Sequence, residues 1–268
     1  MTELVILLMF ALTTALRVNL RSSRRLFSIL SLSASNKSVV RDDSIAKVRE
    51  LMSQQNLDAI IIPTDDPHMS EYTAPYYGRR EFVSGFTGSA GIAIITRNIA
   101  ALFTDGRYHT QAEMELSASW TLMRSGLKDV PSTTDFLLQQ LTAGQRVGID
   151  PFVHSAQNSL QLQYALEGKK ISLVAMQAHP VDEIWTDRPA VPVSQIREHS
   201  LEYAGKSREE KIAVLRDEMK TRGVDFIVLS ALDEIMWLYN IRGQDVPCNP
   251  VSICYALVAP SETFLAHT

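Results

Sequence analysis

The sequence predicts an α/β protein with mixed sheets, built from two tandem copies of one folding pattern, the second shorter than the first. In DDSIAKVRELMSQQNLDAIIIP, starting at residue 42, apolar residues recur on one helical face, and AIIIP follows as a short buried strand that stops at Pro63. The same pattern returns in EEKIAVLRDEMKTRGVDFIVLS, where Ile227 lies 167 positions after Ile60. Each copy then continues into two apolar runs separated by a turn, which predicts a β-hairpin.

The 167-residue repeat is carried by matched residue types along both helix-then-strand segments. The second helix has the clearer ends, since Ser207 and Glu210 form a capping-box pattern and Gly223 is placed for a left-handed C-terminal residue. The matched pairs are Ile45 with Ile212, Ala46 with Ala213, Arg49 with Arg216, Met52 with Met219, Asp58 with Asp225 and Ile60 with Ile227.

Further along, the two copies agree more loosely. FVSGFTG at 82–88 is echoed by WLYNIRG at 237–243, an echo that we interpret as a repeated strand entry. The paired apolar runs are IAIIT with AALFT in the first copy, and SICYALVA with TFLAHT in the second.

The first copy continues with alternating helical and strand patterns for which the second has no counterpart. Helices are expected in DGRYHTQAEMEL, STTDFLLQQL and SAQNSLQLQYAL, and strands in WTLMR, RVGID and ISLV. The second copy lacks the helices that would cover its sheet, so we expect the sequence to be a piece of a longer polypeptide. Between the copies, TDRPAVPVSQ is typical of a linker.

Composition excludes several classes of function. The 268 residues are 46% hydrophobic and 21% charged, an ordinary globular composition with room for two domains. The net charge of -4 and the pI near 5.9 argue against a nucleic-acid partner. Cys248 and Cys254 are too few for a disulfide framework, and we expect both to be small buried residues.

The first 41 residues have the composition of a targeting presequence. LVILLMFALTTAL has the length of a signal-peptide core and is shorter than the ~20 residues of a membrane span. The next stretch is rich in Arg and Ser, and no acidic residue occurs between Glu3 and Asp42. We expect import into a plastid or mitochondrion, through a bipartite or a single presequence; secretion, with Asn36 as a glycosylation site, is the alternative.

The glycine-rich stretch EFVSGFTGSAGIAIIT, residues 81–96, does not match the motifs of phosphate or nucleophile chemistry. Its glycines are spaced G-x-x-G-x-x-G and lead into a strand pattern, unlike a P-loop or a dinucleotide-binding turn. Ser89 has Thr two positions before it, where a nucleophile elbow needs Gly. Two interpretations stay open: glycines that permit a positive φ or a close backbone approach, or a loop presented to a partner or substrate.

Other polar clusters favour structural roles over catalytic ones. DDPHMSEY at 65–72 follows the AIIIP strand and could offer metal ligands, but turn and capping chemistry is commoner for such a loop. RRE at 79–81 is typical of a solvated charge run, with anion recognition by Arg79 or Arg80 as the alternative. Asp105 and Arg107 are expected to form a buried structural pair, and no complete catalytic constellation is visible.

Several ordered motifs together resemble a known family. DDPHMSEY, RREFVSGFTGSAGIAIIT and AALFTDGRYHTQAEMEL are similar to the N-terminal domain of Xaa-Pro aminopeptidase (aminopeptidase P), a relative of prolidase and creatinase. SALDEIMWLYNIRGQDVPCNPVSICYALV is similar to the middle domain of that enzyme. The resemblance implies two ribonuclease-H-like domains: a creatinase-type N-terminal domain at 42–185, a linker at 186–205 and a partial second domain at 206–268.

The resemblance also implies the activity of a longer enzyme. Family members are metallopeptidases, hydrolases that remove the N-terminal residue preceding proline, and their pita-bread catalytic domain holds two divalent metals, typically manganese. All the family's metal ligands belong to that domain, so this chain carries no catalytic or metal residue and is expected to be inactive alone. The alternative is a noncatalytic relative that dimerises or binds peptides.

By analogy, residues of the N-terminal domain reach the mouth of the active site in a neighbouring subunit of a homodimer. This analogy makes the glycine loop a candidate for the rim of the substrate site, where proline-containing peptides would bind, or for a contact between subunits. The candidate residues are Phe86, Thr87, Gly88, Ser89 and Gly91, with His68 and Arg79 as weaker ones.

Overall fold

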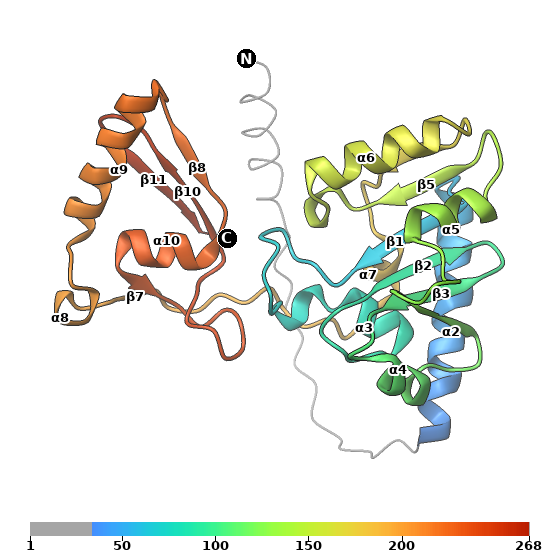
Figure 1. Cartoon of the computed structure of the whole chain (residues 1–268). Helices are drawn as coiled ribbons and strands as arrows, with labels where there is room; N and C mark the ends of the chain where they lie inside the picture. Colours follow the sequence, from blue (N-terminus) through green and yellow to red (C-terminus); the bar gives the residue numbers. More distant parts are fainter. Residues whose placement is uncertain (1–33, 268) are drawn as a thin grey trace. The chain divides into compact units, whose positions relative to one another are not determined.

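A six-stranded mixed sheet organises the first copy of the repeat, in the order β4-β3-β2-β1-β5-β6 (Figure 1). The computed structural model describes the backbone of residues 34–267 and the side chains of residues 43–267, and Ser35–Thr268 forms one compact unit. The pair β1–β2 and the pair β2–β3 are antiparallel, whereas β5 lies parallel to β1 and β4 parallel to β3. The strands are β1 (Ala59–Pro63), β2 (Ile92–Thr96), β3 (Ala100–Thr104), β4 (Trp120–Arg124), β5 (Arg146–Ile149) and β6 (Ser172–Ala175).

Helices cover both faces of this sheet. One core joins α2 and α3 to the sheet through Val48, Met52 and Val83, and the other joins α5 and α6 to it through Phe136, Leu137 and Leu166. The helices are α2 (Ala34–Gln54), η1 (Pro75–Tyr77), α3 (Arg79–Ser84), α4 (His109–Glu115), α5 (Thr133–Gln140), η2 (Pro151–Val153), α6 (Ala156–Glu167) and α7 (Pro180–Ile184).

The second copy repeats the first three strands of the sheet. Its strands follow the order β11-β10-β8, and both pairs are antiparallel, as in β3-β2-β1. A separate small ladder joins β7 (Arg197–Glu198) to β9 (Ile241–Arg242). The remaining elements are α8 (Leu201–Ala204), α9 (Arg208–Arg222), β8 (Ile227–Leu229), α10 (Leu232–Tyr239), β10 (Cys254–Val258) and β11 (Thr263–His267).

The structure confirms the α/β class, both predicted hairpins and the ends of α9. The side chain of Ser207 accepts a hydrogen bond from the N–H of Glu210, and the Glu210 side chain accepts one from the N–H of Ser207. Gly223 has φ 65°, the left-handed conformation that ends the helix.

Among the short helices that were not predicted, α3 and α10 change the interpretation of the FVSGFTG and WLYNIRG echo. Gly85 ends α3 with φ 73°, and Asn240 ends α10 with φ 51°, so both lie in the left-handed region. The echo therefore includes a repeated helix C-terminus, which was not predicted. In both copies the chain then continues into a strand, β2 in the first copy and β9 in the second.

The structure differs from prediction at the start of the first helix, in the linker and at one cysteine. Most of the predicted presequence, residues 1–33, lies outside the described residues, and α2 begins at Ala34, earlier than the expected start at Asp42. The predicted linker at 186–205 contains β7 and α8. Cys254 is buried as predicted, but Cys248 is exposed, a correction. Among the described helices, none is both long and apolar enough to cross a membrane.

Candidate functional site

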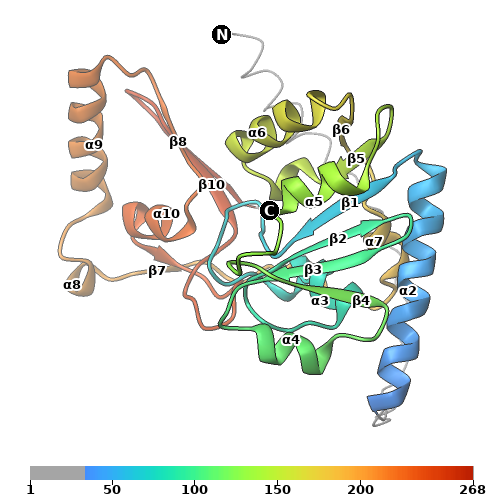
Figure 2. The same cartoon turned by 45° about the vertical axis from the view of Figure 1, so that its right-hand side comes forward.

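The glycine loop, residues 85–91, connects the C-terminus of α3 to β2 (Figure 2). Gly85 needs the left-handed φ, but Gly88 and Gly91 are required by close approach. A Cβ at Gly88 would lie 2.8 Å from Cε2 of Phe86 and from Cδ1 of Tyr108, and one at Gly91 would lie 3.0 Å from the Phe103 carbonyl oxygen. Glycines at three-residue spacing thus allow the loop to pack closely around the buried Phe86 ring.

The buried side chain of Arg80 fixes the inner side of this loop. The guanidinium of Arg80 donates to the carbonyl oxygens of Phe86 (3.2 Å) and Gly88 (2.5 Å), and its carbon lies 4.8 Å from the centre of the Phe86 ring. Burial lowers the pKa of Arg80 to about 10, because the charge has lost much of its hydration. Arg80 therefore fixes two carbonyl groups of the loop from its buried side.

Hydrogen bonds to α4 fix the outer side of the loop. Glu115 accepts from both the N–H and the hydroxyl of Thr87, each at 2.7 Å, and Gln111 donates to the Thr87 hydroxyl. The hydroxyls of Ser89 and Tyr108 are 2.6 Å apart. Thr87 and Ser89 remain exposed, so the loop presents polar groups to solvent while Arg80 and Glu115 hold its backbone.

Arg79, the neighbour of Arg80, lies in an ion-pair network with Asp150 and Asp182. It donates to both carboxylate oxygens of Asp182, at 2.6 and 2.7 Å, and to Asp150 at 2.7 Å. Arg188 makes a second ion pair with Asp182, at 2.8 Å. Burial raises the pKa of Asp182, but hydrogen bonds from Arg79 and the positive charges of Arg79 and Arg188 outweigh it and lower the pKa. The network joins α3 to α7 and to the residue after β5.

His68 lies in the segment that follows β1 and contacts the second copy. Its Nδ1 is 2.9 Å from the carbonyl oxygen of Ser230, and its ring lies 4.5 Å from that of Tyr255. Burial lowers the pKa of His68, partly offset by the bond to Ser230 and the charge of Asp66. Asp66 accepts from the N–H groups of His68 and Ser70, which is turn chemistry.

The Asp105 and Arg107 pair exists but is exposed. Arg107 donates to Asp105 at 2.9 and 2.8 Å, and both side chains are open to solvent. The prediction of a buried pair was wrong, because both residues lie in the turn after β3, outside the core.

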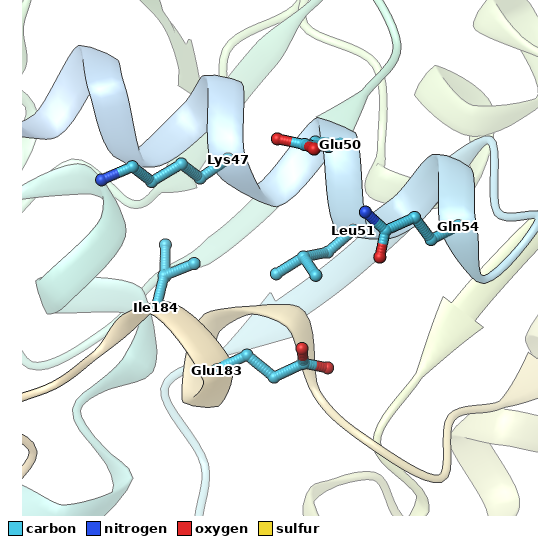
Figure 3. A pocket seen from close by; sticks show the side chains of 6 residues that line it. All are labelled: Lys47, Glu50, Leu51, Gln54, Glu183 and Ile184. Atoms are coloured by element: carbon cyan, nitrogen blue, oxygen red, sulfur yellow. The ribbon is translucent and has the colours of Figure 1, made fainter.

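The described residues do not fit a dinuclear metal site. Within residues 43–267 no group of three or more His, Cys, Asp or Glu side chains could hold a metal ion. A surface pocket of about 230 Å³ lies between α2 and α7, and in it Lys47 and Glu183 point toward opposite ends (Figure 3). Its polar side chains do not converge on one point.

Arg80 and Glu115 are the site residues that sequence reasoning missed in these roles. Arg80 was predicted to lie in a solvated charge run, with anion recognition as the alternative; the prediction of a solvated side chain was wrong, because Arg80 is buried against the glycine loop. Glu115 gave no local signal, since it lies 28 positions from Thr87. The structure brings Phe86, Thr87, Gly88, Ser89 and Gly91 together in one loop, while Arg79 and His68 lie in separate clusters.

Comparisons with known proteins agree with this architecture. Residues 45–183 and 187–267 match two family models, each described as a creatinase/prolidase N-terminal domain. A probable Xaa-Pro aminopeptidase P of Talaromyces marneffei is 45% identical over 230 residues, which are 85% of this chain and 35% of that protein. The corresponding protein of Neosartorya fischeri is 41% identical over 91% of this chain and 38% of its own length.

A solved structure matches both copies. X-prolyl aminopeptidase from Caenorhabditis elegans, described as a cytosolic enzyme with a di-nuclear active site, superposes with a TM-score of 0.80 at 34% identity. The match covers 84% of this chain and 38% of that one, so this chain spans little more than a third of these relatives. Since one family model alone covers more than half of the sequence, the chain belongs to the creatinase/prolidase N-terminal domain family.

Proposed function

We propose that this chain is the N-terminal, noncatalytic portion of a metal-dependent Xaa-Pro aminopeptidase that removes the residue preceding proline. One observation carries the proposal: two creatinase-type domains follow each other in the chain, and 84% of the chain superposes on an X-prolyl aminopeptidase. The metals, by preference manganese, and the hydrolytic groups would belong to another part of that enzyme. This portion would then supply a rigid scaffold and a recognition surface.

Within this function, the glycine loop is the part that meets the substrate mouth or the neighbouring subunit of a homodimer. The proposal is supported by the exposed Thr87 and Ser89, whose positions are fixed by Arg80 and Glu115. Proline-containing peptides are the substrates of the intact enzyme. We also propose that the presequence directs the protein into a plastid or mitochondrion; secretion is the alternative.

The function is tested by the reading frame and by activity. We expect the coding sequence to continue in frame beyond Thr268 into a segment with the metal-ligand order Asp, Asp, His, Glu, Glu. We expect no manganese-dependent cleavage of Xaa-Pro peptides by the purified 268-residue chain. A stop codon after Thr268 in the mature transcript would favour the alternative, a noncatalytic dimerising or peptide-binding relative.

A further inference from the structure

The connecting segment, residues 64–77, follows β1 of the first copy and packs against the second copy of the repeat. Ala74 is 1% exposed and lies in one apolar core with Leu232 and Ile235 of α10. Tyr77 packs against the same core. Since α10 belongs to the second copy, burial of apolar surface joins the two copies at this segment.

His68 supplies a polar contact between the connecting segment and the second copy. Its Nδ1 lies 2.9 Å from the carbonyl oxygen of Ser230, directly after β8, and its ring lies 4.5 Å from the ring of Tyr255 on β10. A carbonyl oxygen only accepts, so Nδ1 carries the proton and donates in this bond. A second proton, taken up at acid pH, must therefore be bound at Nε2.

The surroundings of His68 disfavour a positive charge on its ring. Loss of hydration on burial lowers the pKa of His68 below its ordinary value of 6.5, and the hydrogen bond with Ser230 and the charge of Asp66 offset this effect only in part. Tyr77 and Tyr255 add no charge, because burial raises the pKa of both phenols and keeps them neutral. A proton at Nε2 is thus bound less tightly while the two copies are in contact than when water surrounds the ring.

Asp66 also weakens the closed contact. Its side chain is fully buried, and Oδ1 accepts from the N–H groups of His68 and Ser70. Among the residues that the structure describes, Oδ2 has no hydrogen-bond partner. A buried oxygen without a partner has given up hydration that it would regain in an open, hydrated segment. The contact therefore depends chiefly on its apolar residues.

The linker between the copies has the form of a hinge. Its start is fixed to the first copy, where Nε of Arg188 donates to the carbonyl oxygen of Tyr76 at 2.9 Å. Its far part is fixed to the second copy, where the N–H of Ser194 donates to Asp245 at 2.7 Å. Residues 189–193 run between these two points in an irregular conformation. A short irregular stretch between two fixed ends is where domain rotation is absorbed.

We propose that the connecting segment is a pH-sensitive latch between the two copies, with His68 as its titrating group. Above about pH 6.5 the neutral ring donates to Ser230 and the latch is closed. As the pH falls, a proton at Nε2 favours the open state, and the second copy pivots about residues 189–193. Because the pKa of this base is lowered in the closed state, the ratio of open to closed molecules rises below pH 6.5, by up to about tenfold at pH 5.5.

Single-molecule energy transfer between dyes on the two copies measures this ratio in the purified chain. The dyes are attached at Leu160→Cys on α6 and Val214→Cys on α9, positions that are 65% and 64% exposed. Cys248→Ser removes the exposed natural thiol. We expect the ratio to rise several-fold, up to about tenfold, between about pH 7.5 and pH 5.5. His68→Asn, whose amide can still donate to the Ser230 carbonyl, should remove this rise.

His154→Asn is the matched control, since Nδ1 of His154 lies 2.9 Å from the carbonyl oxygen of Asp150 within the first copy. This variant should show the same rise as the chain without it. All of these proteins keep His179, so its titration contributes equally to each. A ratio that stays constant over this pH range in the chain with His68, or a rise that His68→Asn leaves in place, would overturn the latch.

Nuclear magnetic resonance of the His68 ring tests the latch without dyes. In the 268-residue chain the ring should titrate with a midpoint below 6.5. Proton binding and opening are linked, so Ala74→Asp, which places a charge in the apolar part of the contact, should move the midpoint back toward 6.5. A midpoint at or above 6.5 in the unsubstituted chain would refute the proposal whether or not the variant folds, and so would a midpoint that folded Ala74→Asp leaves unchanged.

Discussion

Replacing Gly88 with Ala tests whether the glycine loop is built around the Phe86 ring. The new Cβ would lie 2.8 Å from Cε2 of Phe86 and from Cδ1 of Tyr108, well inside normal contact distance. Phe86 is fully buried and Arg80 donates to the Gly88 carbonyl, so neither the ring nor the backbone can move freely. Overpacking of this kind costs about 1–3 kcal/mol, and each kcal/mol lowers the Tm of a protein this size by about 2–4 °C.

Thermal and urea unfolding of the purified chain measure this effect. Gly106→Ala is the control, because a Cβ at Gly106 has no atom within 4 Å. The control should stay within about 0.5 kcal/mol of the natural chain, as surface substitutions usually do. If Gly88→Ala unfolds at the same urea concentration as Gly106→Ala, the steric explanation of the glycine spacing is wrong.

The remaining predictions concern charge, capping and pH. Arg80→Met should lower the free energy of unfolding by about 2–4 kcal/mol, because it leaves two loop carbonyls without a donor. Arg107→Met in the exposed pair should leave the midpoint of urea unfolding unchanged. Ser207→Ala should lower the free energy of unfolding by about 1 kcal/mol through loss of the α9 cap. An unfolding midpoint that circular dichroism finds unchanged would contradict this prediction. Burial and the charge of Arg79 lower the pKa of His179 to about 4, so the unfolded chain binds a proton first as pH falls below 6.5. The free energy of unfolding should therefore drop between pH 6.5 and 4, by up to about 1.4 kcal/mol per pH unit, and His179→Asn, which keeps an acceptor for the Val181 N–H, should remove this part of the slope. Parallel pH profiles for the two proteins in urea titrations would refute the assignment.

The elements predicted correctly are those whose sequence signals are local and long enough to show a period. The helix α9 has a capping box at one end and a left-handed glycine at the other, and both lie within its own sequence. The strands β1, β2 and β3 are short apolar runs bounded by turn residues. The 167-residue repeat then extends these local predictions to the second sheet.

The short helices were missed because their stability comes from tertiary packing. α3 has six residues, too few for a helical period to be distinguished from a strand pattern. It is held by the burial of Val83 and by stacking of Phe82 on Trp185, about a hundred positions away in the sequence. Similarly, the C-cap residue that follows α10 is Asn240, a weaker sequence signal than glycine.

The candidate site was predicted only as a loop, without the contacts that hold it. Gly85, Gly88 and Gly91 could be recognised by spacing, but the reason for each differs and depends on Phe86 and Tyr108. The roles of Arg80 and Glu115 follow from the fold, since α4 must pack beside the loop before Glu115 can reach Thr87. Long-range polar contacts of this kind leave no pattern in a single sequence.

The central claim is that this chain is the noncatalytic N-terminal portion of an Xaa-Pro aminopeptidase, and the endogenous protein tests it most directly. An antibody against residues 42–268 should capture a protein well above the 29.9 kDa of this chain, with chelator-sensitive release of the residue before proline. Capture of a 29.9 kDa or smaller protein alone, without that activity, would contradict the claim, and so would such activity in the purified 268-residue chain.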